Sequence, residues 1–400
     1  MRRLGTGDAV FLGLGSMLGA GVFAAFTPAA QSAGAGLLVG LVVAAIVAFC
    51  NASSSAQLAA VYPTSGGTYV YGRERLGPWW GFVAGWSFVV GKTASCAAMA
   101  LTFAAYAAPA GWERPVAIAA VVVIGAVNYR GVAKTATLAR VLVVVTIVAL
   151  AVGVGANAST GIDLGGLDLV AAGPYGILQS AGLLFFAFAG FARIATMGEE
   201  VRDPQRTIPR AILLALGIVV VLYAVVAVVL LGALGPDGLA STETPLATGP
   251  LAPLVRFGAG AAALGALLGL MAGIGRTALA MARERDLPPW LAAVHPRFRV
   301  PHHAEAVLTL VIVALVAVVD LRTAIGFSSF GVLVYYFVAN LAAFSQGAEV
   351  RRYPRVVQVA GALLCAALVV TLPLTSIVGG VLVIAVGVGY RLVRLRVLAR

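Results

Sequence analysis

The sequence has 400 residues, of which 61% are hydrophobic and 10% are charged, and its formal net charge is +12. Soluble domains contain about 45–50% apolar and about 25% charged residues, so this composition excludes an ordinary soluble protein. The apolar residues form long runs without the two-residue alternation of a transmembrane β-strand. A bilayer core about 30 Å thick is crossed by roughly 20 helical residues. The sequence therefore predicts an all-α polytopic membrane protein.

About twelve transmembrane helices are predicted in these apolar runs. They lie near residues 8–32, 35–61, 79–109, 115–128, 136–156, 174–198, 209–235, 251–283, 304–319, 324–347, 356–372 and 375–392. The run at 115–128 is short, and 356–392 is also compatible with one broken segment. No connection is long enough for a soluble domain. No cleavable signal is expected, because the first span is far longer than the apolar region of a signal peptide.

The basic residues are distributed unevenly among the connections. If the N-terminus is cytoplasmic, 22 of the 27 Lys and Arg residues lie in cytoplasmic segments, whereas Arg114, Arg256 and Arg322 lie outside and Lys92 and Arg193 fall within spans. This bias follows the positive-inside rule. It predicts a multi-pass protein of a bacterial inner membrane with both termini in the cytoplasm. The lipid bilayer explains the basic charge, and no nucleic acid partner is expected.

Side chains suited to catalysis or metal binding are sparse. All 15 Asp and Glu residues lie in connections or at span ends, which leaves no acid–base pair inside the membrane. His295, His302 and His303 share one cytoplasmic connection without a carboxylate or cysteine at ligand spacing. The three cysteines fall within apolar runs and are interpreted as small buried side chains. No catalytic residue, metal or cofactor is therefore expected.

Glycines cluster in the first predicted span. Gly13, Gly15, Gly19 and Gly21 each weaken a helix by about 1 kcal/mol relative to alanine. In lipid, a broken helix is tolerated where its free backbone groups line a protein cavity. Glycines also allow helices to pack closely. The cluster alone is compatible with either interpretation.

The third predicted span contains Lys92, about 13 residues from its start, or roughly 20 Å at about 1.5 Å per residue. A charged lysine at the bilayer centre costs about 2.5–3.5 kcal/mol, so it is a candidate functional residue. The alternative is a lysine that snorkels or that clamps backbone carbonyls for structural reasons.

The sixth predicted span places aromatic residues around Ala189 and Gly190. Spans one and six each begin a unit of five spans, and interruptions at corresponding positions of two repeats indicate a transport site near the membrane midplane. The start of a half-helix attracts a carboxylate, and unwound carbonyls accept hydrogen bonds from an ammonium group. A molecule with both groups is an amino acid.

Four motifs occur in order along spans one to eight. They are Gly15–Phe23, Tyr62–Tyr69, Phe185–Phe191 with Gly198–Pro209, and Arg276–Pro288. Together they resemble the signatures of the amino acid–polyamine–organocation (APC) permeases, although they specify no substrate. The resemblance implies a five-plus-five inverted-repeat core at 1–347, with repeats at 1–156 and 174–347. Two additional C-terminal helices would follow at 348–400.

The resemblance also implies which groups bind substrate. Three amides would hold the carboxylate: those of Gly19, Ala20 and Gly21. Four carbonyls would hold the ammonium: those of Met17, Phe186, Ala187 and Ala189. The side chain of Phe188 would act as a gate or pocket lid, unless it packs as an ordinary aromatic residue.

One position departs from the family pattern. Many such permeases have a lysine in the fifth span that occupies a cation site and supports proton coupling, whereas Thr146 stands there in this sequence and cannot titrate. Burial disfavours the charged form of a lysine. Lys92 therefore either couples transport to protons or repels cationic substrates, and both versions favour neutral amino acids.

An inner gate is expected after the sixth span. Arg193 would pair there with Glu199 or Glu200, the alternative being an interfacial anchor. The mixed charges of residues 198–209 are also compatible with a solvated turn that has no part in transport.

These features predict a secondary transporter that moves amino acids by alternating access, with protons as a candidate coupling ion. The alternative within transport is an exchanger of amino acids or polyamines. Outside it, a channel or a membrane-embedded enzyme remains open.

Overall fold

The computed structural model describes residues 4–63, 66–131, 136–198 and 200–398. Its helices are α1 (Thr6–Met17), α2 (Ala20–Ala24), α3 (Phe26–Ala33), η1 (Gly34–Gly36), α4 (Leu37–Val61), α5 (Thr68–Leu76), α6 (Pro78–Ala107), α7 (Glu113–Tyr129), α8 (Ala136–Ala158), α9 (Gly173–Phe188), η2 (Ala189–Phe191), α10 (Ala192–Ala195), α11 (Pro204–Ser241), α12 (Ala252–Arg283), η3 (Pro289–Ala292), α13 (His302–Val318), α14 (Leu321–Phe344), α15 (Arg355–Thr371) and α16 (Leu374–Leu398). Within these described ranges no strand forms, and Leu4 and Val201 make one parallel β-bridge.

The helices follow the predicted spans closely. In the described parts of the chain, nine helical segments are long and apolar enough to cross a membrane, and α13 and α15 are shorter apolar helices. Helix α7 occupies the short run predicted as the fourth span. The region 356–392 forms two helices, α15 and α16, which are separated at Leu372 and Pro373. The predicted all-α polytopic architecture is therefore confirmed.

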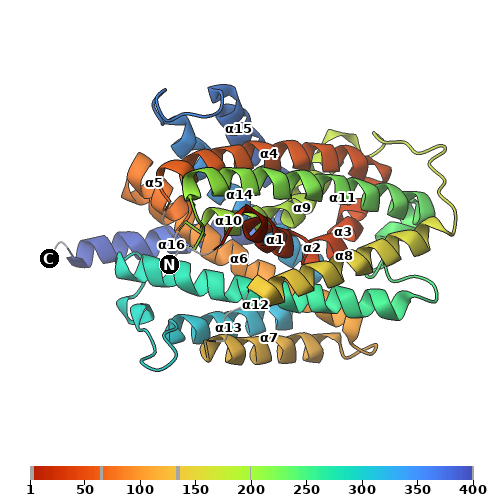
Figure 1. The fold of residues 1–400 in the computed structure, drawn as a ribbon, viewed down its shortest axis with the longest axis horizontal. Coiled ribbons are helices and arrows are strands. Elements are labelled where there is room, and N and C mark those ends of the chain that lie inside the picture. Colours follow the sequence, from red (N-terminus) through yellow and green to blue (C-terminus); the bar gives the residue numbers. More distant parts are fainter. Residues whose placement is uncertain (1–3, 64–65, 132–135, 199, 399–400) are drawn as a thin grey trace.

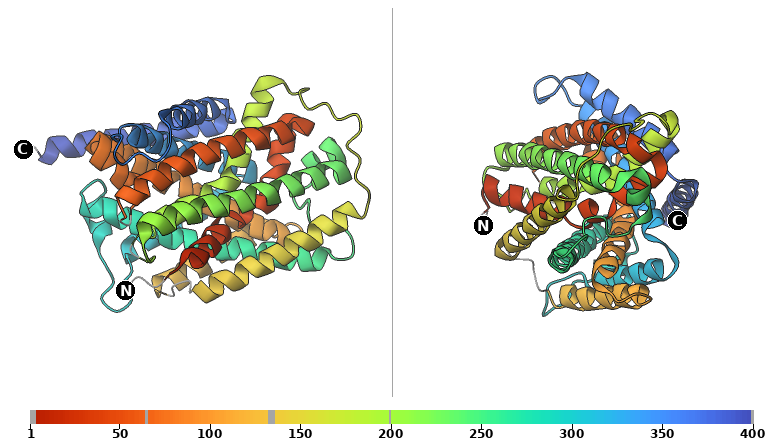
Figure 2. Two further views of the ribbon diagram at one scale, coloured as in Figure 1. Left: turned by 45° about the horizontal axis from the view of Figure 1, so that its top comes forward. Right: turned by 90° about the vertical axis from the view of Figure 1, so that its right-hand side faces the viewer.

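The broken N-terminal segment lies in the middle of the bundle. Figure 1 shows α1 and α2 between α4, α9 and α11 on one side and α6 and α12 on the other, with α7 and α13 at one edge and α15 at the opposite edge. The first residues of α1 and the last residues of α16 lie toward the same end of the bundle (Figures 1 and 2).

Small residues allow the closest helix contacts. A Cβ added at Gly331 of α14 would lie only 2.7 Å from the Cα of Gly91 on α6. Two glycines in register therefore let these backbones touch, as small residues commonly do between membrane helices. The contact fixes α6, which carries Lys92, against α14.

The C-terminal helix α16 is held by a buried ion pair. Arg391 bonds to Asp286, which follows α12, and both side chains are less than one-tenth exposed. Asp286 also accepts a hydrogen bond from the Tyr69 hydroxyl at 2.9 Å. The Arg391 guanidinium lies 4.9 and 4.8 Å from the ring centroids of Trp79 and Phe82 on α6. A charge buried in this way is costly without its partner, so the last helix is tightly joined to α6 and α12.

Candidate functional site

The first membrane segment is interrupted at Leu18 and Gly19. Helix α1 ends at Met17 and α2 begins at Ala20, while Gly19 has φ −65° and ψ −130°, outside the helical region. The glycines also serve close packing, because a Cβ at Gly19 would lie 2.5 Å from the Cβ of Ala266 on α12. Both interpretations of the glycine cluster thus hold at once.

The second interruption lies where the aromatic motif predicted it. Helix α9 ends at Phe188, and residues Ala189–Phe191 form the 3₁₀ turn η2 before α10. A Cβ at Gly190 would lie 2.4 Å from the carbonyl oxygen of Ser16 in α1. The absence of a side chain at Gly190 therefore lets the two interrupted segments cross in direct backbone contact.

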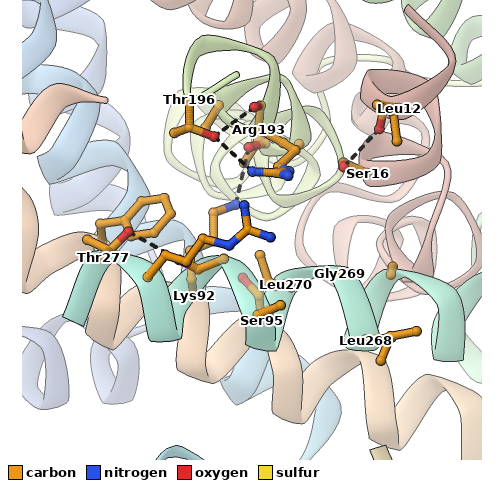
Figure 3. Close-up of a pocket in the computed structure, with 18 of the residues that line it drawn as sticks. Leu12, Ser16, Lys92, Ser95, Arg193, Thr196, Leu268, Gly269, Leu270 and Thr277 are labelled. Atoms are coloured by element: carbon orange, nitrogen blue, oxygen red, sulfur yellow. Dashed lines mark hydrogen bonds between the residues drawn. The ribbon is translucent and has the colours of Figure 1, made fainter. Parts of the chain in front are cut away.

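A cavity of about 530 Å³ begins at this crossing. In the described residues its walls come from six helices, represented by Ser16 (α1), Lys92 (α6), Asn128 (α7), Phe186 (α9), Arg193 (α10) and Thr277 (α12). Figure 3 shows side chains of α1, α6, α10 and α12 turned toward this common space. The lining continues along α12 to its last residue, Arg283. The cavity therefore runs from the helix breaks toward the end of the bundle that holds both termini.

Lys92 connects the cavity wall to the second break. Its side chain is 5% exposed, and its Nζ donates a hydrogen bond to the carbonyl oxygen of Ala189 at 3.2 Å. That carbonyl lies at the end of α9, where the helix dipole favours a cation. Its geometry is therefore that of a clamp on a backbone carbonyl, the structural alternative that the sequence left open.

Tyr223 of α11 was missed by sequence reasoning. Its hydroxyl lies 2.6 Å from the carbonyl oxygen of Met17 and 3.1 Å from that of Ala187, so it bridges the ends of α1 and α9. The available signal was a tyrosine in an otherwise aliphatic stretch of the seventh span, since a buried tyrosine hydroxyl usually finds a partner. Its partners lie far away in the sequence and could not be named.

The other predicted substrate-binding residues divide into two groups. Phe186 and Ala189 line the cavity. The cavity lining does not include Gly19, Ala20, Gly21, Met17, Ala187 or Phe188. The ring of Phe188 is fully buried and packs edge-on against Tyr223, with centroids 5.0 Å apart. Thr146 is likewise outside the lining; its hydroxyl donates to Leu142 of the same helix.

Charged groups gather at the end of the cavity that lies away from the helix breaks. Glu200 lies 3.5 Å from the guanidinium of Arg193 and 3.4 Å from that of Arg276 on α12. Arg193 also donates to the Thr196 hydroxyl at 3.2 Å, as Figure 3 shows. The structure therefore brings together the predicted partners Arg193 and Glu200, and it adds Arg276. Glu199 lies outside the described residues.

At the opposite end of the bundle, Arg322 at the start of α14 connects this helix to α3 and α9. Its guanidinium donates to the side chains of Gln31 and Ser32 of α3, at 3.2 and 3.0 Å, and to Gln179 of α9 at 3.4 Å. These bonds tie the two interrupted segments to α14 beyond the breaks. The cavity lining, by contrast, extends from the breaks toward the other end of the bundle, as far as Arg283.

In this polytopic helical protein two interrupted helices cross at one end of a cavity, an arrangement typical of membrane carriers. The comparison with known proteins agrees. The chain belongs to the amino acid permease family, whose sequence model matches residues 4–391. The resemblance to the APC permeases is therefore confirmed, and transport of amino acids or related solutes is the activity of this family.

Relatives carry several different names. A Mycobacterium tuberculosis protein named an uncharacterized transporter is 58% identical over 396 residues, covering 97% of this chain and 90% of the relative. The branched-chain amino acid permease BcaP of Bacillus subtilis is 26% identical over 76% of this chain and 72% of its own length. Cationic amino acid transporter 7 of Arabidopsis thaliana is 28% identical over 84% of this chain and 64% of its own length.

Proposed function

We propose that this protein is a secondary transporter that carries amino acids across the bacterial cytoplasmic membrane by alternating access. The observation that supports this most strongly is the crossing of two interrupted helices at one end of the cavity. The cavity has a volume of about 530 Å³, within the range of about 300–1,000 Å³ that is typical of small-molecule sites. In this proposal the structure corresponds to one of two alternating states: the cavity extends from the breaks to Arg283, and the hydrogen bonds of Arg322 hold the opposite end of the bundle together.

In this proposal the two breaks bind the backbone of the amino acid. The amides of Gly19, Ala20 and Gly21 hold its carboxylate, since the first N–H groups of a helix lack partners within that helix. The carbonyls near the breaks hold its ammonium. In the described state, Tyr223 and Lys92 occupy the carbonyls of Met17, Ala187 and Ala189, so an incoming ammonium takes over bonds that the protein makes with itself.

The cavity charge supports a preference for neutral over cationic amino acids. Among the described residues, four basic side chains line the cavity, namely Lys92, Arg193, Arg276 and Arg283, against the one carboxylate of Glu200. A cationic substrate side chain would meet a repulsive field in this space. The names of the relatives do not decide the matter, because they include both branched-chain and cationic amino acids.

Counterflow in proteoliposomes tests the proposed function. Vesicles preloaded with an unlabelled neutral amino acid should accumulate the labelled form from outside in a saturable way, and empty vesicles much less. A channel would equilibrate the label without saturation, and an enzyme would convert it. If none of the twenty amino acids and common polyamines gives counterflow, the proposed function is wrong. Uptake into empty vesicles distinguishes net transport from obligatory exchange.

We also propose that both termini lie in the cytoplasm, on the evidence of the Lys and Arg bias. The cavity then faces inward. Cytoplasmic reporters fused before residue 4 and after residue 396 should both be active. Activity of a periplasmic reporter at either end would reverse this orientation.

A further inference from the structure

A buried carboxyl group lies directly behind the cavity wall. Glu305 of α13 is 3% exposed, and its Oε2 has no hydrogen-bond partner. Among the Asp and Glu side chains of the described residues, it is the one buried oxygen without a hydrogen-bond partner. The carboxyl group fits against α12 because residue 275 is glycine: a Cβ there would lie 2.4 Å from Oε1. The neighbouring helix therefore provides the space that this side chain fills.

Helix α13 packs against α6, α7, α12 and η3. Among the described residues of these elements, Arg276 on α12 and Cys96 on α6 act electrostatically on Glu305. The fourth neighbouring element, η3, has no titratable side chain between Pro289 and Ala292. An ionised carboxylate that lacks partners in such a place is costly, whereas a protonated one carries no charge to be stabilised.

Arg276 links Glu305 to the inner end of the cavity. It follows Gly275 on α12 and acts electrostatically on Glu305, but it donates a hydrogen bond to Glu200, at 3.4 Å. Glu200 in turn is part of the segment that follows α10. Arg276 thus bonds to one carboxylate, Glu200, and acts electrostatically on a second, Glu305, so the charge of Glu305 determines how strongly it competes.

We propose that Glu305 is a proton-binding site that controls the Arg276–Glu200 bridge. When the carboxylate takes up a proton, its charge disappears and Arg276 stays with Glu200, as in this structure. When the proton leaves to the cytoplasmic solution, the carboxylate draws Arg276 away, which loosens the link between α12 and the segment after α10. Only an O–H bond forms or breaks. This proposal rests on the proposed function, because the bridge borders the transport cavity.

Infrared spectroscopy and exchange assays test the proposal together. The purified full-length protein is compared between mildly acidic and mildly alkaline pH for the C=O stretch of a protonated carboxyl group. Glu305→Gln should lose this titrating band, and Glu349→Gln, the same change at an exposed carboxylate, should keep it. In proteoliposomes with equal pH on both sides, exchange by the wild type should change several-fold over this range. In Glu305→Gln it should vary less than twofold.

Gly275→Ala provides a variant that keeps the carboxyl group. The added methyl group displaces Oε1, so the band should titrate at a different pH. A titrating band that persists in Glu305→Gln, or an exchange profile identical to that of the wild type, overturns the proposal. A protein that shows the Glu305 band but exchanges no amino acid retains the proton site and refutes the proposed function instead.

Discussion

Ala20→Pro should strongly weaken amino acid binding while the protein still inserts and folds. Ala20 is the first residue of α2, the position at which a helix accepts proline most readily. A proline disfavours helical backbone angles at the residue before it. Gly19 has ψ −130°, which is not helical, so its conformation is compatible with a proline at position 20. The substitution therefore removes one N–H donor at the proposed carboxylate site and leaves the helix start in place.

A hydrogen bond to a charged group contributes about 1.5–3 kcal/mol, so we expect affinity to fall by roughly 10- to 100-fold. Titration calorimetry of the purified variant with a neutral amino acid measures the loss. Ala20→Gly is the matched control, because it changes the same side chain and keeps the N–H. Gel filtration and the melting temperature show whether both variants fold. Wild-type affinity in folded Ala20→Pro would remove these amides from the binding site.

The positions of the helices and of their breaks could be predicted because both depend on local sequence. Long apolar runs mark the spans, and the glycines from Gly13 to Gly21 mark the first interruption, which lies at Leu18 and Gly19. The aromatic stretch around Gly190 marked the second. Lys92 stood out because a charge is rare at such depth.

The partners across the bundle could not be predicted. The hydroxyl of Tyr223 bonds to Met17, 206 residues away, and Lys92 bonds to Ala189, 97 residues away. Such pairs depend on which helix faces meet, which hydropathy does not specify. Glu305 illustrates the same limit. It stands in the first turn of its helix, where a carboxylate is usually solvated, and only the packing of α12 against α13 reveals its burial.

Lys92→Met should change selectivity or coupling more than any other substitution in the cavity. The variant retains the length of the side chain but removes its charge and its hydrogen bond to Ala189. If Lys92 repels cationic substrates, arginine and lysine should bind at least tenfold more tightly, about 1.4 kcal/mol, because like charges a few ångströms apart repel strongly in a partly dry cavity. If Lys92 carries the coupled proton, accumulation driven by a pH gradient should disappear while exchange at equal pH persists.

These two roles and a structural one give different results in a single set of measurements. Competition of unlabelled arginine and lysine against a labelled neutral amino acid reports selectivity, and uptake into vesicles with and without a pH gradient reports coupling. Arg114→Met is the matched control, because Arg114 also donates to a backbone carbonyl, that of Ala317, but lies exposed and outside the cavity. Exchange with equal pH on both sides also distinguishes the role of Lys92 from that of Glu305. Loss of Glu305 should make the exchange rate nearly independent of pH. If selectivity, accumulation and pH profile are all unchanged in Lys92→Met and only its melting temperature falls, then Lys92 is a structural clamp on the end of α9.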